Sequence, residues 1–175
     1  FIKKLVAKCD TNTLLLFHTI EYGTKIYNKL KEELEDKDFY YIDGEVSGRK
    51  REEIKKQMEI TSDKVKVLVA SFGTLSTGVS IRAIFNVIFA DSFKSEQIII
   101  QSIGRGLRQS DDGRTTKLFD VADDLHVGSH KNFTLKHSAE RIKIYTKEGF
   151  KYKIYPIDLK PIQGLDDDTV FDQTT

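Results

Sequence analysis

Two arginines that share a helical face are the first candidates for chemistry in this chain. They are Arg105 and Arg108 in the stretch QSIGRGLRQ, and on a helix of about 3.6 residues per turn Gln101 falls on the same face. Gly104 and Gly106 interrupt the stretch, although each glycine costs a helix about 1 kcal/mol relative to alanine. Because paired guanidinium groups with room beside them bind polyphosphates, the stretch predicts a phosphate-facing helix. The alternative is a surface helix whose arginines are solvated.

The composition limits the function only weakly. The 175 residues, of which 39% are hydrophobic and 31% charged, are typical of one globular domain with a tail. Lys and Arg number 28 and Asp and Glu 27, so the net charge favours no class of partner. No apolar run reaches the roughly 20 residues of a membrane span, and four scattered histidines do not predict a metal site. The single cysteine, Cys9, excludes an internal disulfide and is typical of a reducing compartment.

Short apolar runs alternate with helical patterns along most of the chain. The expected strands are Thr13–His18, Phe39–Asp43, Lys64–Ala70, Asn86–Asp91 and Thr115–Asp124. The expected helices between them cover residues 20–36, 48–60 and 95–109. This alternation predicts an α/β fold, with a parallel sheet that carries helices on both faces. Ligands of such sheets lie outside the carboxyl ends of the strands.

The pattern changes after Asp124. A helix is expected over Thr134–Glu148, followed by KYKIYPIDL as a strand or an extended arm. On this helix His137, Arg141 and Tyr145 share one face, which predicts either packing across the domain or a guide for a nucleic-acid strand. We expect a main domain at residues 1–128, a packed helix and arm at 129–160, and a flexible acidic tail at 161–175.

Four stretches of the chain resemble motifs of superfamily-2 helicases. QSIGRGLR resembles motif VI (Gln-x-x-Gly-Arg-x-x-Arg), and TLLLFHTIEYG, YYIDGEVSGRKREEIKKQ and VLVASFGTLSTGVSI resemble motifs IV, IVa and V. The motifs follow the family's order over about residues 1 to 155. Their style is similar to that of phage recombination and repair helicases of the UvsW type. The resemblance implies a RecA-like fold and the second motor lobe of a helicase.

The resemblance also implies roles for residues at an ATP site. Arg108 is expected to be the arginine finger, Arg105 to contact the γ-phosphate and Gln101 to hydrogen-bond within the site. In motif V, Gly78 and Ser80 are expected to approach the nucleotide. Many members of the family have an aspartate at the position of Ser80, so this departure leaves the choice of nucleotide open.

A second set of residues is expected to hold nucleic-acid phosphates. It comprises His18, Thr19, Gly44, Arg49, Thr74, Ser76 and Thr77. The alternative for the hydroxyl residues is that they only cap helices, and for the charged stretch RKREEIKK that it is a solvated helix face. Contacts of this kind bind the backbone rather than the bases, which suits a motor that passes any sequence.

The family's P-loop and Asp-Glu box have no counterpart in this sequence, and the sequence begins at Phe1. We therefore expect the second lobe of a longer ATP-dependent DNA helicase or translocase of recombination, replication or repair, inactive by itself. The implied partners are an N-terminal RecA-like lobe and DNA, and the implied cofactor is ATP, with Mg²⁺ held mainly by the other lobe. The implied location is the cytoplasm of a phage-infected bacterial cell. An RNA helicase lobe and a non-catalytic adaptor are the alternatives.

Overall fold

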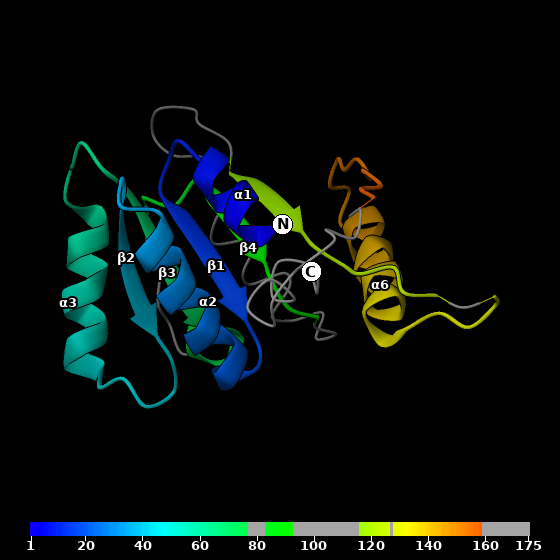
Figure 1. Cartoon of the computed structure of the whole chain (residues 1–175), viewed down its shortest axis with the longest axis horizontal. Coiled ribbons are helices and arrows are strands. Elements are labelled where there is room, and N and C mark those ends of the chain that lie inside the picture. The colour runs from blue at the N-terminus through cyan, green and yellow to red at the C-terminus, as the bar shows by residue number, and fades with distance from the viewer. Residues whose placement is uncertain (77–82, 93–115, 127, 159–175) are drawn as a thin grey trace, which may run out of the picture.

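A five-stranded, wholly parallel sheet forms the centre of the molecule. The computed structural model describes residues 1–76, 83–92, 116–126 and 128–158. The strands are β1 (Thr13–Phe17), β2 (Lys37–Ile42), β3 (Val65–Ser71), β4 (Asn86–Phe89) and β5 (Lys117–Asp120). Their order in the sheet is β2-β3-β1-β4-β5, and every neighbouring pair is parallel (Figure 1). The predicted α/β fold with a parallel sheet is therefore confirmed.

Helices cover both faces of this sheet. They are α1 (Ile2–Lys8), α2 (Ile20–Glu33), α3 (Gly48–Glu59), α4 (Phe72–Ser76) and α6 (Phe133–Lys147). Successive strand residues point to opposite faces, so Leu15 and Phe17 pack with α1 and α2, whereas Leu14 and Leu16 pack with α3, α4 and α6. In Figure 1, α1 and α2 lie in front of the sheet. The apolar residues therefore build two cores, one on each side of the strands.

Side-chain size and charge fix how the helices meet the sheet. Ile26 and Leu30 are buried one helical turn apart on α2, as the sequence period predicts. Gly23 lies against the ring of Phe17, where a Cβ atom would have no room. The buried Lys66 of β3 donates to two carbonyls near the end of α3, and a cation is favourable at that end of a helix. No helix within the described ranges is long and apolar enough to span a membrane.

Three sequence expectations differ from the structure. Helices α1 and α4 were not predicted, because seven and five residues are too short for a periodic signal. Strand β5 has four residues instead of the ten expected, because its partner β4 is itself only four residues long. The segment Lys151–Asp158 forms no strand, so that alternative is wrong; Pro156 there has no N–H for a ladder, and the segment is exposed. The helix expected at 95–109 and the tail at 161–175 lie outside the described residues.

Candidate functional site

The strands deliver their following residues to one edge of the sheet, because all five run in the same direction. His18 and Thr19 follow β1, Asp91 follows β4, and Asp123 follows β5. The sequence placed the first two at this edge as phosphate contacts. It did not predict a role for Asp91, although the Asp91 carboxylate connects the residues at this part of the edge by hydrogen bonds.

The carboxylate of Asp91 bridges β4 to the start of α2. Its Oδ2 accepts hydrogen bonds from the backbone N–H groups of His18 at 3.2 Å and Thr19 at 3.3 Å, and lies 3.5 Å from the Thr19 hydroxyl. Its Oδ1 accepts from the N–H of Ser92 at 2.6 Å. Thr19 occupies the N-cap position of α2 but makes no capping bond with its own side chain. The negative charge of Asp91 therefore lies at the positive end of α2 and stabilises it.

This geometry bears on the predicted phosphate contacts of His18 and Thr19. Both backbone N–H groups lie at the edge where such contacts are expected, but an internal anion already binds them. A nucleic-acid phosphate that uses them has to compete with Asp91. The predicted contact stays a prediction.

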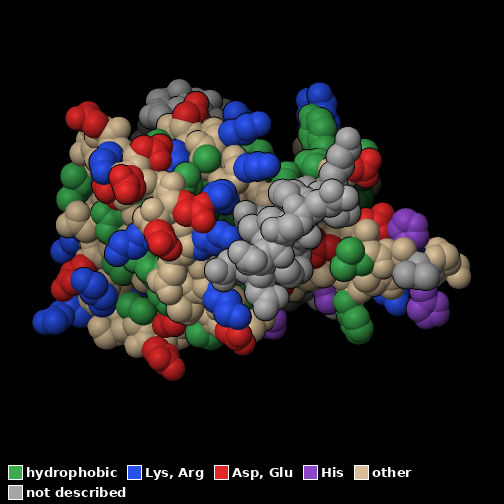
Figure 2. Space-filling model, viewed as in Figure 1, with side chains coloured by type: hydrophobic (Ala, Val, Ile, Leu, Met, Phe, Trp, Pro, Cys, Tyr) green, Lys and Arg blue, Asp and Glu red, His purple; other side chains and the backbone are tan. Residues whose placement is uncertain are grey.

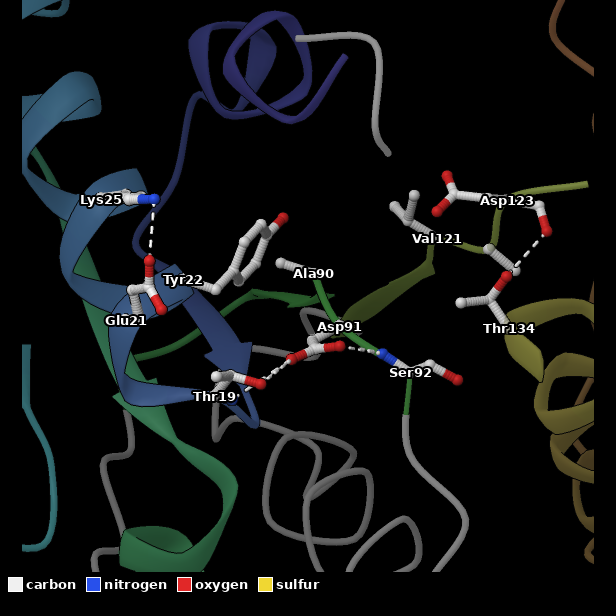
Figure 3. A pocket seen from close by; sticks show the side chains of 11 residues that line it. Thr19, Glu21, Tyr22, Lys25, Ala90, Asp91, Ser92, Val121, Asp123 and Thr134 are labelled. Carbon is white, nitrogen blue, oxygen red and sulfur yellow. Dashed lines mark hydrogen bonds and ion pairs between the residues drawn. The ribbon is translucent and has the colours of Figure 1, made fainter. Parts of the chain in front are cut away.

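A pocket of about 350 Å³ opens beside Asp91 (Figure 3). It is lined by Thr19, Glu21, Tyr22, Lys25, Ala90, Asp91, Ser92, Val121, Ala122, Asp123 and Thr134. Glu21 and Lys25 pair with each other at 2.9 Å at its rim. Asp91 and Asp123 both belong to the lining, and they follow the neighbouring strands β4 and β5.

The two aspartates shape the electrostatics of this pocket. Burial, together with the negative charge of Asp91, raises the pKa of the Asp123 carboxyl group. Burial and the same two carboxylates raise the pKa of the Tyr22 hydroxyl. Excess negative charge disfavours a phosphate in the pocket itself. The pocket suits hydrogen-bond donors, whereas phosphate contacts require other groups along the edge.

Three of the predicted phosphate contacts follow β3 in the chain, and two of them, Thr74 and Ser76, lie in helix α4. The hydroxyl of Thr74 is buried and lies 2.6 Å from that of Ser71, so it joins the start of α4 to the end of β3. A phosphate contact by Thr74 would require the hydroxyl to change its partner. Ser76 closes α4, and Thr77 follows it; the side chain of Ser76 and the whole of Thr77 lie outside the described residues.

The loop after β2 is organised by Asp43 and Arg51. Oδ1 of Asp43 accepts from two N–H groups of the loop, at 3.0 and 3.3 Å. Arg51 donates to the carbonyl groups of Asp43 and Gly44, each at 3.1 Å. Arg49 extends into solvent with 92% of its side chain exposed, and lies 3.7 Å from Glu53. Gly44 and Arg49 are therefore accessible at this edge, and Arg51 is the residue that holds their loop in place.

The face of α6 that carries His137, Arg141 and Tyr145 packs against the domain. The Arg141 guanidinium is buried and donates to both oxygens of Asp120, at 2.8 and 2.6 Å. The Tyr145 hydroxyl donates to the same carboxylate at 2.8 Å, and Nδ1 of His137 lies 2.7 Å from the Ser92 hydroxyl. The packing alternative is therefore confirmed for this face. No local pattern in the sequence indicates that Asp120, at the end of β5, is the partner.

The residues expected at the nucleotide lie outside the described part of the chain. They are Gln101, Arg105, Arg108, Gly78 and Ser80. Their expected roles therefore depend on the sequence and on related proteins.

Comparison with known proteins identifies the family. The profile of the helicase conserved C-terminal domain matches residues 1–110. The ATP-dependent DNA helicase uvsW of Enterobacteria phage T4 is 31% identical over an alignment of 164 residues, and the match covers 88% of this chain and 32% of that protein. The chain thus spans about a third of the length of this relative.

Solved structures agree with this relationship. The crystal structure of T4 UvsW matches with a TM-score of 0.67 and 30% identity, over 85% of this chain and 32% of that one. The C-terminal domain of the DEAD-box protein Dbp5 matches with a TM-score of 0.62 over 85% of this chain and 76% of that one, and at 16% identity this likeness shows the fold alone. The chain therefore belongs to the superfamily-2 helicases, as a RecA-like conserved C-terminal domain related to the UvsW helicase of phage T4.

Proposed function

We propose that this chain is the second motor lobe of an ATP-dependent DNA helicase or translocase that acts in recombination, replication or repair. The observation that carries the proposal is the 31% identity to the phage T4 DNA helicase across 88% of the chain. The carboxyl edge of the parallel sheet supports it, because four stretches that resemble helicase motifs border that edge or follow its strands in the chain.

In the proposed mechanism, Arg105 and Arg108 act on the γ-phosphate of ATP that the other lobe binds. Arg108 stabilises the charge that develops as the phosphoryl group leaves, Arg105 holds the same phosphate, and Gln101 hydrogen-bonds within the site. Gly78 and Ser80, which follow α4 in the sequence, approach the nucleotide. Closure of the two lobes brings the arginines into place, and release after hydrolysis lets the lobes separate.

The proposed nucleic-acid path follows the same edge of the sheet. It includes His18, Thr19, Gly44, Arg49, Thr74, Ser76 and Thr77. The exposed guanidinium of Arg49 and the open loop at Gly44 support this path, whereas His18, Thr19 and Thr74 have to exchange internal partners to take part. Contacts through backbone N–H and hydroxyl groups bind phosphates of any sequence.

The proposal requires a second lobe as the principal partner. That lobe supplies the P-loop and the Asp-Glu box and holds most of the Mg²⁺ coordination, so this chain alone is expected to hydrolyse no ATP.

The decisive experiment measures DNA-stimulated ATP hydrolysis by a polypeptide that carries both lobes. Arg108→Ala is expected to lower the rate by about 10³-fold or more, because an arginine finger contributes about 10³ to 10⁵ in rate. Lys4→Ala, which removes an exposed cation from α1, is the matched control and is expected to retain the rate. Replacing the DNA by RNA of the same length tests the choice of nucleic acid. An Arg108→Ala enzyme with wild-type activity would refute the proposed site.

A further inference from the structure

Exposed apolar side chains gather at the C-terminal end of the described chain. Of the eight large hydrophobic side chains that are exposed among the described residues, six lie between Leu125 and Ile157. Four of these six stand in the short segment from Tyr152 to Ile157, where Tyr155 is 72% exposed. Single exposed hydrophobic residues are ordinary, but a run of four in six positions indicates a surface that binds something.

Positive charge is interleaved with these side chains. The segment reads KYKIY from Lys151 to Tyr155, so two exposed lysines alternate with aromatic and aliphatic residues. Neither lysine forms an ion pair with a residue that the structure describes. Figure 2 shows Lys or Arg side chains beside hydrophobic ones at the end of the molecule that this segment occupies. From here on, the name arm is used only for the segment Lys151–Tyr155, which is the first part of the extended arm expected from the sequence.

The arm leaves α6 from a well-defined base. Gly149 adopts a φ of 72°, and the N–H groups of Gly149 and Phe150 donate to carbonyls of the last turn of α6, at 3.2 and 2.9 Å. These two bonds form a Schellman motif, which ends a helix in a fixed direction. Phe150 packs against the core, and the hydroxyl of Tyr152 lies 3.2 Å from that of Thr146. The first residues of the arm are therefore held, while the Tyr155 ring is open.

The arm is separate from the carboxyl edge of the sheet. His137, in the first half of α6, contacts Ser92 at that edge. Helix α6 then runs past Asp120 and away from the carboxyl edge (Figure 1). The proposed nucleic-acid path at the carboxyl edge does not include any residue of the arm. A ligand that binds the arm therefore contacts the domain at a second place, separate from the proposed nucleic-acid path.

Alternating lysines and exposed rings match one class of ligand. Single-stranded nucleic acid offers unpaired bases that stack on aromatic rings and phosphates that pair with ammonium groups. An apolar protein surface would cover the rings but would also remove Lys151 and Lys153 from water without a partner, which is unfavourable. We propose that the arm is a stacking site for single-stranded nucleic acid, outside the contacts made by the helicase motifs. The proposal rests on the proposed function, because it gives a motor domain an additional contact with its track.

The test measures the affinity of the 175-residue chain for a fluorescein-labelled oligothymidine of about 20 nucleotides by fluorescence anisotropy. Tyr155→Ala is expected to weaken binding at least about fivefold, whereas Tyr155→Phe, which keeps the ring, binds like the wild type. The double variant Lys151→Gln/Lys153→Gln is expected to bind more weakly and to lower the slope of log K against log salt by about 1.4. The control Lys4→Gln/Lys8→Gln removes the same charge from exposed positions of α1 and is expected to leave the affinity within about twofold.

Several outcomes would overturn the proposal. They are a wild-type chain that does not bind the oligonucleotide, arm variants with unchanged affinity, or an equal loss in the α1 control. A change of oligomeric state in the arm variants, without a change in affinity, would assign the arm to a protein contact instead. Circular dichroism checks that each variant is folded. The proposed motor function is tested separately, by Arg108→Ala in the ATPase assay. The motor function can therefore hold when the arm proposal fails, and the arm proposal can hold when the motor function fails.

Discussion

The buried ion pair between Arg141 and Asp120 allows a sharp prediction about stability. Only 1% of the Arg141 side chain and 14% of the Asp120 side chain are exposed, and two hydrogen bonds of 2.8 and 2.6 Å join them. Arg141→Met removes the cation and leaves the Asp120 carboxylate largely buried without it. Loss of one partner of a buried pair costs about 3–5 kcal/mol, so the free energy of unfolding is expected to fall by that amount.

The same helix offers a control. Lys143 pairs with Glu140 at 2.7 Å, a distance close to that of the buried pair, but 71% and 55% of the two side chains are exposed. Lys143→Met is expected to cost less than about 1 kcal/mol, because water already screens that pair. The double variant Asp120→Asn/Arg141→Met is expected to recover most of the loss of Arg141→Met. Neither charge remains buried in it, and the asparagine still accepts from Tyr145.

The assay is equilibrium unfolding of the 175-residue chain in urea, followed by circular dichroism. Equal m-values across the variants establish that the same surface becomes exposed in each case. A cost below about 1 kcal/mol for Arg141→Met would refute the reasoning. So would a double variant that is as unstable as the sum of its two single variants, because the two residues would then be uncoupled.

Three further predictions concern the sheet and its carboxyl edge. Gly23→Ala is expected to lower the free energy of unfolding by about 1–3 kcal/mol in urea unfolding, because the new methyl group collides with the ring of Phe17; wild-type stability would contradict the close packing. Lys66→Met is expected to cost about 1–3 kcal/mol in the same assay, because two carbonyls near the end of α3 lose their donor. Asp91→Asn is expected to move the pKa of Asp123 down towards that of an ordinary aspartate, measured by NMR titration, because one of the two causes of its upward shift disappears. In the wild type, Asp123 disfavours folding at neutral pH, and this penalty decreases as the pH falls through its raised pKa; in Asp91→Asn that pH dependence is expected to be smaller.

The sheet could be predicted because its signal is local. The strand Thr13–Phe17 has a continuous apolar run after its first residue, and a strand that is covered on both faces requires such a run. Helix α2 has its apolar side chains at a helical period for the same reason. Strand β2 shows the limit, because it begins at Lys37 and not at Phe39. The buried Lys37 donates to the carbonyl of Cys9 at 2.9 Å, and no local pattern predicts that a lysine will find such a partner.

The candidate site could likewise be predicted only in part from the sequence. Its location at the carboxyl edge follows from the alternation of strands and helices, so His18 and Thr19 could be placed there. Their actual partner, Asp91, is 73 and 72 residues away along the chain, and only the folded sheet brings it to the start of α2. Arg141 was expected on a shared face with Tyr145, and that face is correct. Whether the face meets water or protein depends on Asp120, which lies 21 residues earlier.

The attachment of α6 has a mechanical consequence. A helix of 15 residues is about 22 Å long, and the Asp120 carboxylate at the end of β5 accepts three hydrogen bonds from its second half, two from Arg141 and one from Tyr145. His137, in the first half of the helix, contacts Ser92, and the helix ends in the turn at Gly149. Because these contacts hold the helix at two places along its length, we expect a shift of β5 to move the helix as one body. We therefore expect the turn at Gly149, where the arm begins, to follow movements of the end of β5.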